Sequence, residues 1–220
     1  MSSLNRNTPS QPLIGVLALQ GDFAEHIHML GEIGVHAVEV RKVEQLFEID
    51  GLIIPGGEST TIVKLLMRFE FVDQLRSRVE SGMALWGTCA GMIVIARELT
   101  DSYPTPLNLL DIGVSRNYFG RQVDSFEAEI DIEGIDGEAM RAVFIRAPVV
   151  SDVGDGVVKI ASLDDGQAVA VKKGRVLASS FHPELTTDTR MHSLFVELAR
   201  EGQIDTLNPT RNAEEISNTA

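Results

Sequence analysis

The first half of the chain alternates short apolar runs with segments of helical periodicity, and this alternation constrains the fold more than any other feature. Apolar runs at residues 13–19, 35–40, 52–54 and 83–86 have the length and composition of buried strands. Between them, apolar residues recur every three or four positions, as on one face of a helix. Strands that alternate with helices predict a mostly parallel sheet covered by helices on both faces. We therefore expect a three-layer α/β fold.

The second half shows closely spaced strand patterns with few helices between them. The expected strands cover residues 126–132, 142–145, 156–163, 167–172 and 175–181. Turn residues at 164–166 and 173–174 suit hairpins. These strands should therefore add antiparallel partners to the sheet. A last amphipathic helix is expected at residues 191–199.

Composition narrows the class of protein. A chain of 220 residues fits one domain, which we place at residues 13–202, between flexible tails at 1–12 and 203–220. The formal charge of −13 disfavours nucleic-acid binding, since an acidic surface repels phosphate. No apolar run is long enough to span a membrane, and the polar start lacks a signal-peptide pattern. A cytoplasmic location is expected.

The single cysteine lies where a nucleophile would be held. Cys89 is the centre of residues 87–91 (GTCAG), between an expected strand and an expected helix. The G-x-C-x-G pattern is typical of a nucleophile elbow, a tight turn whose glycines avoid collision with neighbouring backbone. The start of the following helix favours the thiolate, which is the reactive form. The alternative is a turn followed by a structural cysteine in the core.

A thiolate that attacks an amide needs a base that can also protonate the leaving amine, usually a histidine. Of the five histidines, His182 differs because it directly follows an apolar strand. The carboxyl ends of parallel strands meet at one edge of a sheet, so His182 should reach Cys89 there. Pro183 restricts the local backbone, so Glu184 can fall on the same side and orient the imidazole. A surface loop is the alternative for both residues.

The remaining histidines have ordinary expected environments. Solvated or core-edge positions are expected for His26, His28 and His192, and His36 begins a strand.

A glycine pair follows the third expected strand. Gly56 and Gly57 lie between that strand and a helix that Ser59 or Thr60 can cap. Two adjacent glycines let backbone N–H groups approach a ligand closely. Together with the N–H of Ala90, they would stabilise the oxyanion of a tetrahedral intermediate. An ordinary turn is the alternative for the glycine pair.

Several longer motifs accompany the Cys–His–Glu set. They are residues 19–22 (LQGD), 25–26 (EH), 55–60 (PGGEST), 116–117 (RN), 119–122 (FGRQ), 144–148 (FIRAP) and 181–185 (FHPEL). With the elbow, these motifs resemble the class I, or triad-type, glutamine amidotransferases. More narrowly, they look like the glutaminase subunits of pyridoxal 5′-phosphate synthases. The resemblance covers residues 14–199 and shows no departure at a catalytic position.

That resemblance implies hydrolysis of L-glutamine to L-glutamate and ammonia, with Cys89 as nucleophile, His182 as general acid and base, and Glu184 as its orienting carboxylate. It implies that the ammonia passes to a barrel-type synthase subunit, whose multimeric core carries several glutaminase subunits. It implies no cofactor and no metal. The residues it implies for glutamine binding are Gly57, Glu58, Ser59, Arg116, Ile145 and Arg146. The first helix, with Glu25 and His26, would suit contact with the synthase.

Two other readings share parts of the pattern. A γ-glutamyl hydrolase or another cysteine hydrolase of similar fold would share the elbow and the His-x-Glu segment. Such an enzyme would not require residues 116–122 and 144–148, and it would act on glutamyl peptides without a partner. A non-catalytic subunit that only docks on the synthase would bind its partner without glutaminase activity.

Overall fold

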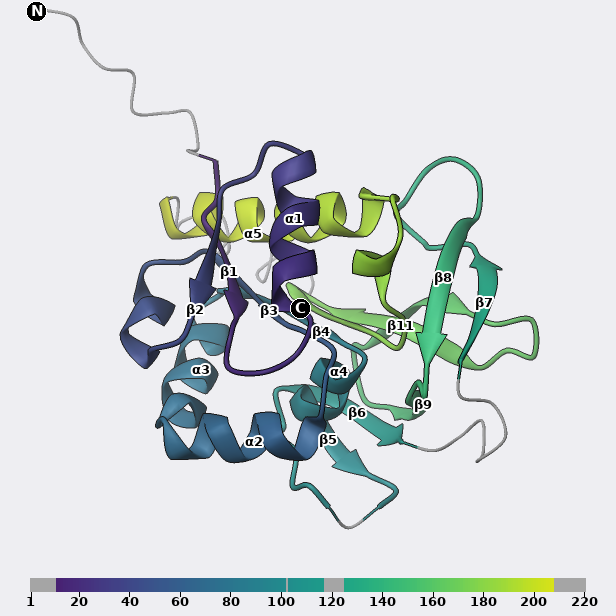
Figure 1. The fold of residues 1–220 in the computed structure, drawn as a ribbon, viewed down its shortest axis with the longest axis horizontal. Coiled ribbons are helices and arrows are strands. Elements are labelled where there is room, and N and C mark those ends of the chain that lie inside the picture. The colour runs from purple at the N-terminus through teal and green to yellow at the C-terminus, as the bar shows by residue number, and fades with distance from the viewer. Residues whose placement is uncertain (1–10, 102, 117–124, 208–220) are drawn as a thin grey trace, which may run out of the picture.

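A seven-stranded sheet forms the centre of the molecule in this computed structural model, which describes residues 11–101, 103–116 and 125–207 (Figure 1). Its strands are β1 (Ile14–Leu17), β2 (Ala37–Val40), β3 (Gly51–Ile54), β4 (Ala84–Thr88), β10 (Val158–Ser162), β11 (Ala168–Lys173) and β12 (Val176–Ser179). They lie in the order β10-β11-β12-β4-β3-β1-β2. The five strands from β12 to β2 are parallel, and β11 and β10 add antiparallel strands at one edge. The mixed sheet and its added hairpin confirm the expected fold class.

Helices cover both faces of this sheet. They are α1 (Phe23–Glu32), α2 (Ser59–Arg68), α3 (Phe71–Glu80), α4 (Ala90–Ile95) and α5 (Arg190–Leu207). Alternate strand residues point to opposite faces, so each strand feeds two cores. Ile53 of β3 packs in the core that includes α1 and α5, whereas Leu52 and Ile54 pack in the core that includes α2, α3 and α4. These two apolar cores make the three layers.

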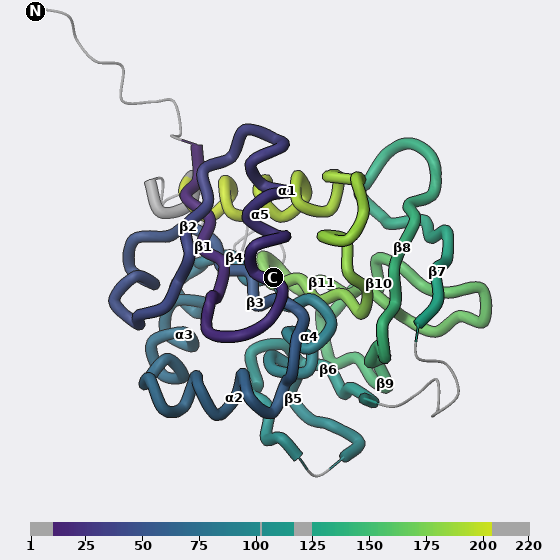
Figure 2. The backbone as a smooth tube through the Cα atoms, viewed as in Figure 1, coloured from purple at the N-terminus to yellow at the C-terminus, as the bar shows by residue number. Residues whose placement is uncertain are grey.

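Smaller strands surround the edge where β10 lies. They are β5 (Ala96–Leu99), β6 (Leu110–Ser115) and β9 (Val149–Val153), which form one sheet, and β7 (Ser125–Ile130) and β8 (Met140–Ile145), which form a hairpin. Two short 3₁₀ helices, η1 (Val43–Phe47) and η2 (Pro183–Leu185), complete the elements of the described residues. Figure 2 follows the chain from the β1–β2 side to the β7–β10 side.

Some of these elements differ from the sequence expectation. Helical character was expected over residues 90–97, but α4 ends at Ile95 and Ala96 begins β5. Residues 93–95 are all β-branched, which weakens helix propensity, and the next residues pair with β6 instead. The strands β5, β6 and β9 were not expected. Their pairing partners are distant in sequence, so local patterns carry little of the signal.

Helix starts differ in a similar way. Helix α2 is capped by Glu58, whose carboxylate accepts from the N–H groups of Thr60 and Thr61, and not by Ser59 or Thr60. Asp22 stands at the N-cap of α1, but its side chain makes no cap hydrogen bond. That carboxylate instead lies near His182, as described below.

The last helix runs past its expected end. Helix α5 continues beyond Ala199 to Leu207, and the side chain of Gln203 donates to Oδ2 of Asp50 at 2.8 Å. That bond ties the added turns to the loop before β3. Residues 203–207, which we expected in a tail, therefore continue the helix, while residues 1–10 and 208–220 lie outside the described chain. Among the described residues, no helix combines the length and apolar character needed to cross a membrane.

Candidate active site

Cys89 occupies the turn between β4 and α4, as the elbow pattern predicted. Its backbone has φ +46° and ψ −104°, a region that side-chain-bearing residues seldom adopt. The surroundings fix this conformation, because the N–H of Cys89 donates to the carbonyl of Ser179 in β12 at 2.8 Å. The thiol is free and 8% exposed. A positive φ at an almost buried cysteine is the geometry expected of a strained elbow.

The flanking glycines are required by packing. A Cβ on Gly91 would lie 2.0 Å from the carbonyl oxygen of Ile54, and a Cβ on Gly87 would lie 2.6 Å from the backbone of Gly91. Both contacts are far shorter than real Cβ contacts and meet backbone atoms, which cannot rotate away. The elbow therefore fits only because both positions lack a side chain.

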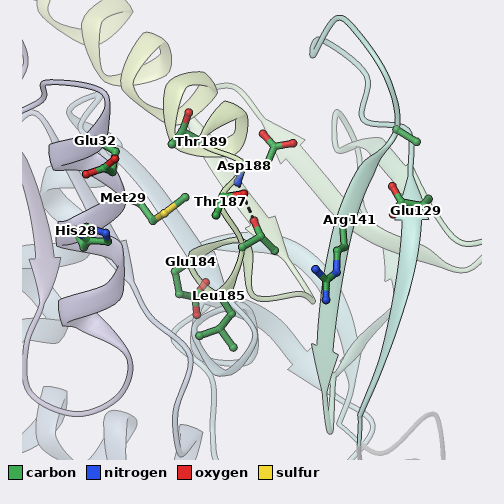
Figure 3. Close-up of a pocket in the computed structure, with 12 residues that line it drawn as sticks. His28, Met29, Glu32, Glu129, Arg141, Glu184, Leu185, Thr187, Asp188 and Thr189 are labelled. Carbon is green, nitrogen blue, oxygen red and sulfur yellow. Dashed lines mark hydrogen bonds between the residues drawn. The ribbon is translucent and has the colours of Figure 1, made fainter.

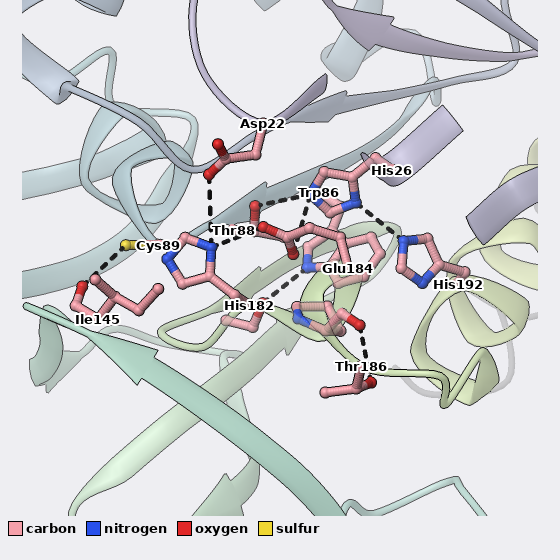
Figure 4. A network of polar contacts seen from close by, with 12 residues as sticks. Asp22, His26, Trp86, Thr88, Cys89, Ile145, His182, Glu184, Thr186 and His192 are labelled. Atoms are coloured by element: carbon pink, nitrogen blue, oxygen red, sulfur yellow. Dashed lines mark hydrogen bonds and ion pairs between the residues drawn. The ribbon is translucent and has the colours of Figure 1, made fainter. Parts of the chain in front are cut away.

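His182 lies beside the thiol at the end of the neighbouring strand. It follows β12, which pairs in parallel with β4, and its N–H donates to the carbonyl of Val143 at 2.8 Å. Its Nδ1 donates to Oε1 of Glu184 at 2.7 Å, and Figure 4 shows the other ring nitrogen turned towards Cys89. The side chains of His182 and Glu184 are 5% and 0% exposed. The structure therefore brings together Cys89, His182 and Glu184 in the order that the sequence predicted.

The electrostatics of this set favour an ion pair. Burial lowers the pKa of His182, but its hydrogen bonds and attraction to Cys89 and Glu184 outweigh burial and raise the pKa to about 10. Burial raises the pKa of Glu184, and the bonded imidazole opposes that shift. The partners of His182 therefore favour its protonated form, and the ring lies between the sulfur of Cys89 and the carboxylate of Glu184.

Asp22 adds a second carboxylate, which the sequence analysis named only as part of the motif at residues 19–22. Its Oδ2 lies 3.8 Å from Nδ1 of His182, and burial raises its pKa while His182 opposes the shift. Asp22, His182 and Glu184 place potential ligand atoms within 4.8 Å of one another, a set of the kind that can hold a metal ion. A metal there would compete for the Nδ1 that already bonds Glu184, so the set suits proton transfer better.

The glycine pair after β3 lies against the same imidazole. A Cβ on Gly56 would lie 2.4 Å from Cε1 of His182, and the carbonyl of Gly56 accepts from the N–H of Asp22 at 3.1 Å. Gly57 has φ +150° and packs on Gln20, whose side chain accepts from the N–H of Glu58 at 2.8 Å. The glycine pair that was expected to form the oxyanion loop therefore lies beside His182. Ala90, the other expected donor, begins α4 directly after Cys89.

The residues implied for glutamine binding surround this centre unevenly. The carbonyl of Ile145 faces Sγ of Cys89 at 3.9 Å, and Arg146 follows it with φ +43° and an exposed side chain. Arg116 donates to the carbonyl of Tyr103 at 2.6 Å. Ser115 pairs with Val149, so both arginines leave the same end of the small sheet.

Other members of the implied set have structural partners already. Ser59 is buried, and the carboxylate of Glu58 is engaged by the start of α2. Asn117 and residues 119–122, which contributed to the resemblance, lie outside the described residues.

Two histidines lie elsewhere than expected. His26 and His192 were expected at solvated or core-edge positions, but both are completely buried behind Glu184. His26 is therefore not available for surface contact with a partner, whereas Glu25 is exposed. The signal was present in the sequence, since His26 lies four residues before Leu30 on the apolar face of α1.

A hollow lies next to this site without sharing its chemistry. Its lining includes His28, Glu32, Arg141, Glu184 and Asp188, between α1, β8 and the segment before α5 (Figure 3). Neither Cys89 nor His182 lines it. The reaction would therefore take place on the other side of the Glu184 carboxylate.

Known proteins share this chain's sequence and fold over most of its length. Residues 16–201 match the SNO glutamine amidotransferase family. The chain is 55% identical over 189 residues to "Pyridoxal 5′-phosphate synthase subunit PdxT" of Dehalococcoides mccartyi, covering 85% of this chain and 97% of the relative. It is 51% identical over 199 residues to the protein of that name from Rhodococcus jostii, covering 87% and 98%.

Solved structures agree with the sequence relatives. A crystal structure described as a glutamine amidotransferase superposes with a TM-score of 0.80 at 52% identity and covers 84% of this chain and 98% of that chain. A putative GMP synthase subunit from Thermoplasma acidophilum has a TM-score of 0.66 at 15% identity, covering 90% of this chain and 99% of that chain. The second likeness concerns the fold alone.

Proposed function

The chain belongs to the SNO glutamine amidotransferase family, and on that basis we propose that it is a glutaminase subunit of pyridoxal 5′-phosphate synthase. It hydrolyses L-glutamine to L-glutamate and ammonia, and the ammonia serves the synthesis of pyridoxal 5′-phosphate. The observation that carries the proposal is the buried line Cys89–His182–Glu184, closed by the 2.7 Å bond between Nδ1 and Oε1. Such a line can activate a thiol and return its proton to a leaving amine.

In the first half-reaction, the thiolate of Cys89 attacks the side-chain amide carbon of glutamine. The carbonyl oxygen becomes an oxyanion, which the N–H groups of the Gly56–Gly57 loop and of Ala90 stabilise. His182 gives its proton to the amide nitrogen, the C–N bond breaks, and ammonia leaves. The product is a thioester between Cys89 and the glutamyl group.

In the second half-reaction, neutral His182 removes a proton from water, which attacks the thioester. The carbon–sulfur bond breaks, glutamate leaves and the thiolate and imidazolium are restored. Throughout both steps Glu184 keeps Nδ1 protonated and the ring oriented, as the third member of such triads does. The raised pKa of His182, at about 10, suits the first step, where the imidazole must carry a proton at neutral pH.

Substrate recognition follows from charge. Glutamine carries a carboxylate and an ammonium at the end remote from the amide. Arg116 and Arg146 would pair with the carboxylate, because guanidinium groups match carboxylate geometry. Backbone groups at Ile145 would meet the ammonium, and Gly57, Glu58 and Ser59 would contact the substrate beside the oxyanion loop.

The partner follows from the relatives. The relatives are named as subunits of pyridoxal 5′-phosphate synthase, so this chain works with a synthase subunit that consumes the ammonia. We place that partner as a barrel-type protein in a multimeric core carrying several glutaminase subunits. A cytoplasmic location belongs to the same proposal, since a catalytic free thiol suits a reducing compartment.

Ammonia release from L-glutamine tests this function, measured for wild type and Cys89→Ala with and without the synthase subunit. We expect strong release only from the complex that contains wild-type chain. Cys89→Ser is the matched control, since it keeps the shape of the side chain and replaces only the sulfur. Equal release by Cys89→Ala would refute the nucleophile, and binding without release in any sample would leave a protein that only docks.

A further inference from the structure

A second layer of buried polar groups lies behind the Glu184 carboxylate. Oε2 of Glu184 is fully buried and has no hydrogen-bond partner among the described residues. Nε2 of His26 lies 3.4 Å from this oxygen. The same nitrogen contacts Oγ1 of Thr88 at 3.2 Å, and Nδ1 of His26 contacts Nε2 of His192 at 2.9 Å (Figure 4). A line of side chains therefore runs from Glu184 through His26 to His192.

Burial favours the neutral form of both of these histidines. Burial lowers the pKa of His26 well below its usual value, and the neighbouring His192 and His182 lower it further. Burial lowers the pKa of His192 to about 4. Each ring therefore carries one N–H and one bare nitrogen, and only two arrangements of the pair are consistent with the bond between them.

The surroundings favour one arrangement. If His26 carried its proton on Nδ1, its bare Nε2 would face the Glu184 carboxylate, and His192 would need its proton on Nδ1, which has no partner among the described residues. A buried donor without an acceptor is costly, and two lone pairs facing each other repel. With both protons on Nε2, His192 donates to His26, and His26 directs its N–H between Thr88 and Glu184. The unpartnered atom is then only a bare ring nitrogen.

We propose that His26 is a positioning residue for the glutaminase reaction, which directs its Nε2–H at the outer oxygen of Glu184 and is itself fixed in that tautomer by His192. The proposal rests on the proposed function, because Glu184 must orient His182 for the positioning to affect turnover. The line of polar side chains starts at Cys89, just after β4, and ends in α1 and α5, the helices on one face of the sheet.

The physical effect is on the charge of Glu184. Burial favours the protonated acid, and a protonated Glu184 would no longer stabilise the imidazolium of His182. An N–H that approaches the ionised oxygen at 3.4 Å opposes that tendency, because its positive end favours the charged form. Trp86 packs edge-on against both rings, at 5.6 Å from His26 and 5.2 Å from His192, which limits their rotation. The layer therefore holds one carboxylate in its charged state and in one orientation.

The tautomers can be observed directly by nitrogen NMR of histidine-labelled wild-type chain, alone and in the complex. We expect both His26 and His192 to be neutral at neutral pH and protonated on Nε2. Assignment comes from His26→Gln and His192→Gln, each of which removes one set of signals. A proton on Nδ1 of His26 would overturn the proposal, whether or not the complex releases ammonia.

Kinetics of the synthase complex test the consequence. His26→Phe keeps a buried ring but has no N–H to donate, so we expect kcat to fall roughly 10- to 100-fold with KM little changed, as when the outer partner of a site histidine is lost. The alkaline limb of the pH profile should move to lower pH, because a Glu184 that is more easily protonated stabilises the imidazolium of His182 less. His26→Gln keeps an N–H near the position of Nε2 and should restore most of the activity and the wild-type limb.

Two controls separate this role from a structural one. Thr88→Val removes the other acceptor of the His26 N–H, and we expect it to keep the wild-type alkaline limb. His36→Phe changes an exposed histidine outside the site and should leave the profile unchanged. A wild-type limb in folded His26→Phe, or the same shift in Thr88→Val, would refute the role. An inactive wild-type complex would refute the proposed function instead, and the NMR measurement would still decide the geometry.

Discussion

Replacing Gly56 with alanine should disable the histidine while leaving the fold intact. The added Cβ would lie 2.4 Å from Cε1 and 3.0 Å from Nδ1 of His182, and 3.2 Å from Oδ2 of Asp22. Carbon atoms in contact lie about 3.5 Å apart, so the ring must retreat by about 1 Å. It can retreat only by giving up its 2.7 Å bond to Glu184 or its contact with Cys89.

The size of the effect follows from that displacement. A misplacement of about 1 Å of a reacting group can cost about 100-fold in rate, which corresponds to about 2.7 kcal/mol of activation free energy. We therefore expect kcat/KM for ammonia release in the synthase complex to fall by about 100-fold. Gly31→Ala is the matched control, because no atom lies within 4 Å of the added Cβ on that exposed helical residue. It should raise stability by about 0.5–1 kcal/mol and keep full activity.

A second assay separates the histidine from the oxyanion loop. Alkylation of the thiol by iodoacetamide at neutral pH reports how well His182 supports the thiolate, and the chain has one cysteine, so the signal comes from one site. Gly56→Ala should be alkylated more slowly than wild type. If Gly56→Ala keeps the turnover rate, the alkylation rate and the unfolding transition of wild type, the imidazole does not occupy this position during the reaction. The assignment of His182 as base is then wrong.

Three further changes probe the elbow and the buried charges. Gly91→Ala places a Cβ 2.0 Å from the backbone oxygen of Ile54, so urea denaturation should show a loss of about 3 kcal/mol or more, and wild-type stability would contradict the packing argument. The folded-state pKa of His192 is lowered from 6.5 to about 4, so its contribution to stability is present above pH 6.5 and is lost as the pH falls towards 4. The Tm of His192→Phe should therefore depend less on pH in that window than the Tm of wild type. Parallel Tm curves for the two proteins would refute the assignment. The folded-state pKa of His182 is raised from 6.5 to about 10, so its contribution is complete below pH 6.5 and is lost as the pH rises through 10. Tm of wild type should therefore approach that of His182→Gln over this range, and a constant difference would show that the pKa is not raised.

The layers of the fold could be predicted because the strand and helix patterns are visible in short stretches of the sequence. The apolar runs that became β1, β3 and β4 are short, continuous and followed by turn residues, so both their type and their parallel pairing were accessible. The strands β6 and β9 were missed because distant partners stabilise them, and such pairing leaves little trace in a local window. The end of α4 was missed for the same reason, since pairing with β6 draws Ala96 out of the helix.

The candidate site shows the same division between local and distant signals. That Cys89 and His182 lie together could be predicted because glycines flank one and an apolar strand precedes the other, and both features are local. The substrate-binding residues came from resemblance rather than from local chemistry. His26 was placed wrongly because its place on the apolar face of α1 was not given weight. Its partner His192 lies in α5, which follows by most of the length of the chain, so the polar contact between them left no local signal.

The strand order also determines when the chain becomes reactive during its synthesis. The ribosome makes β4 and its cysteine early, but the neighbour that supplies the histidine, β12, is among the last elements made. Until β12 has been made, the nascent chain has the thiol of Cys89 but neither His182 nor Glu184, which follow β12. The proposed triad can therefore form only after most of the chain has been synthesised and β12 has paired with β4.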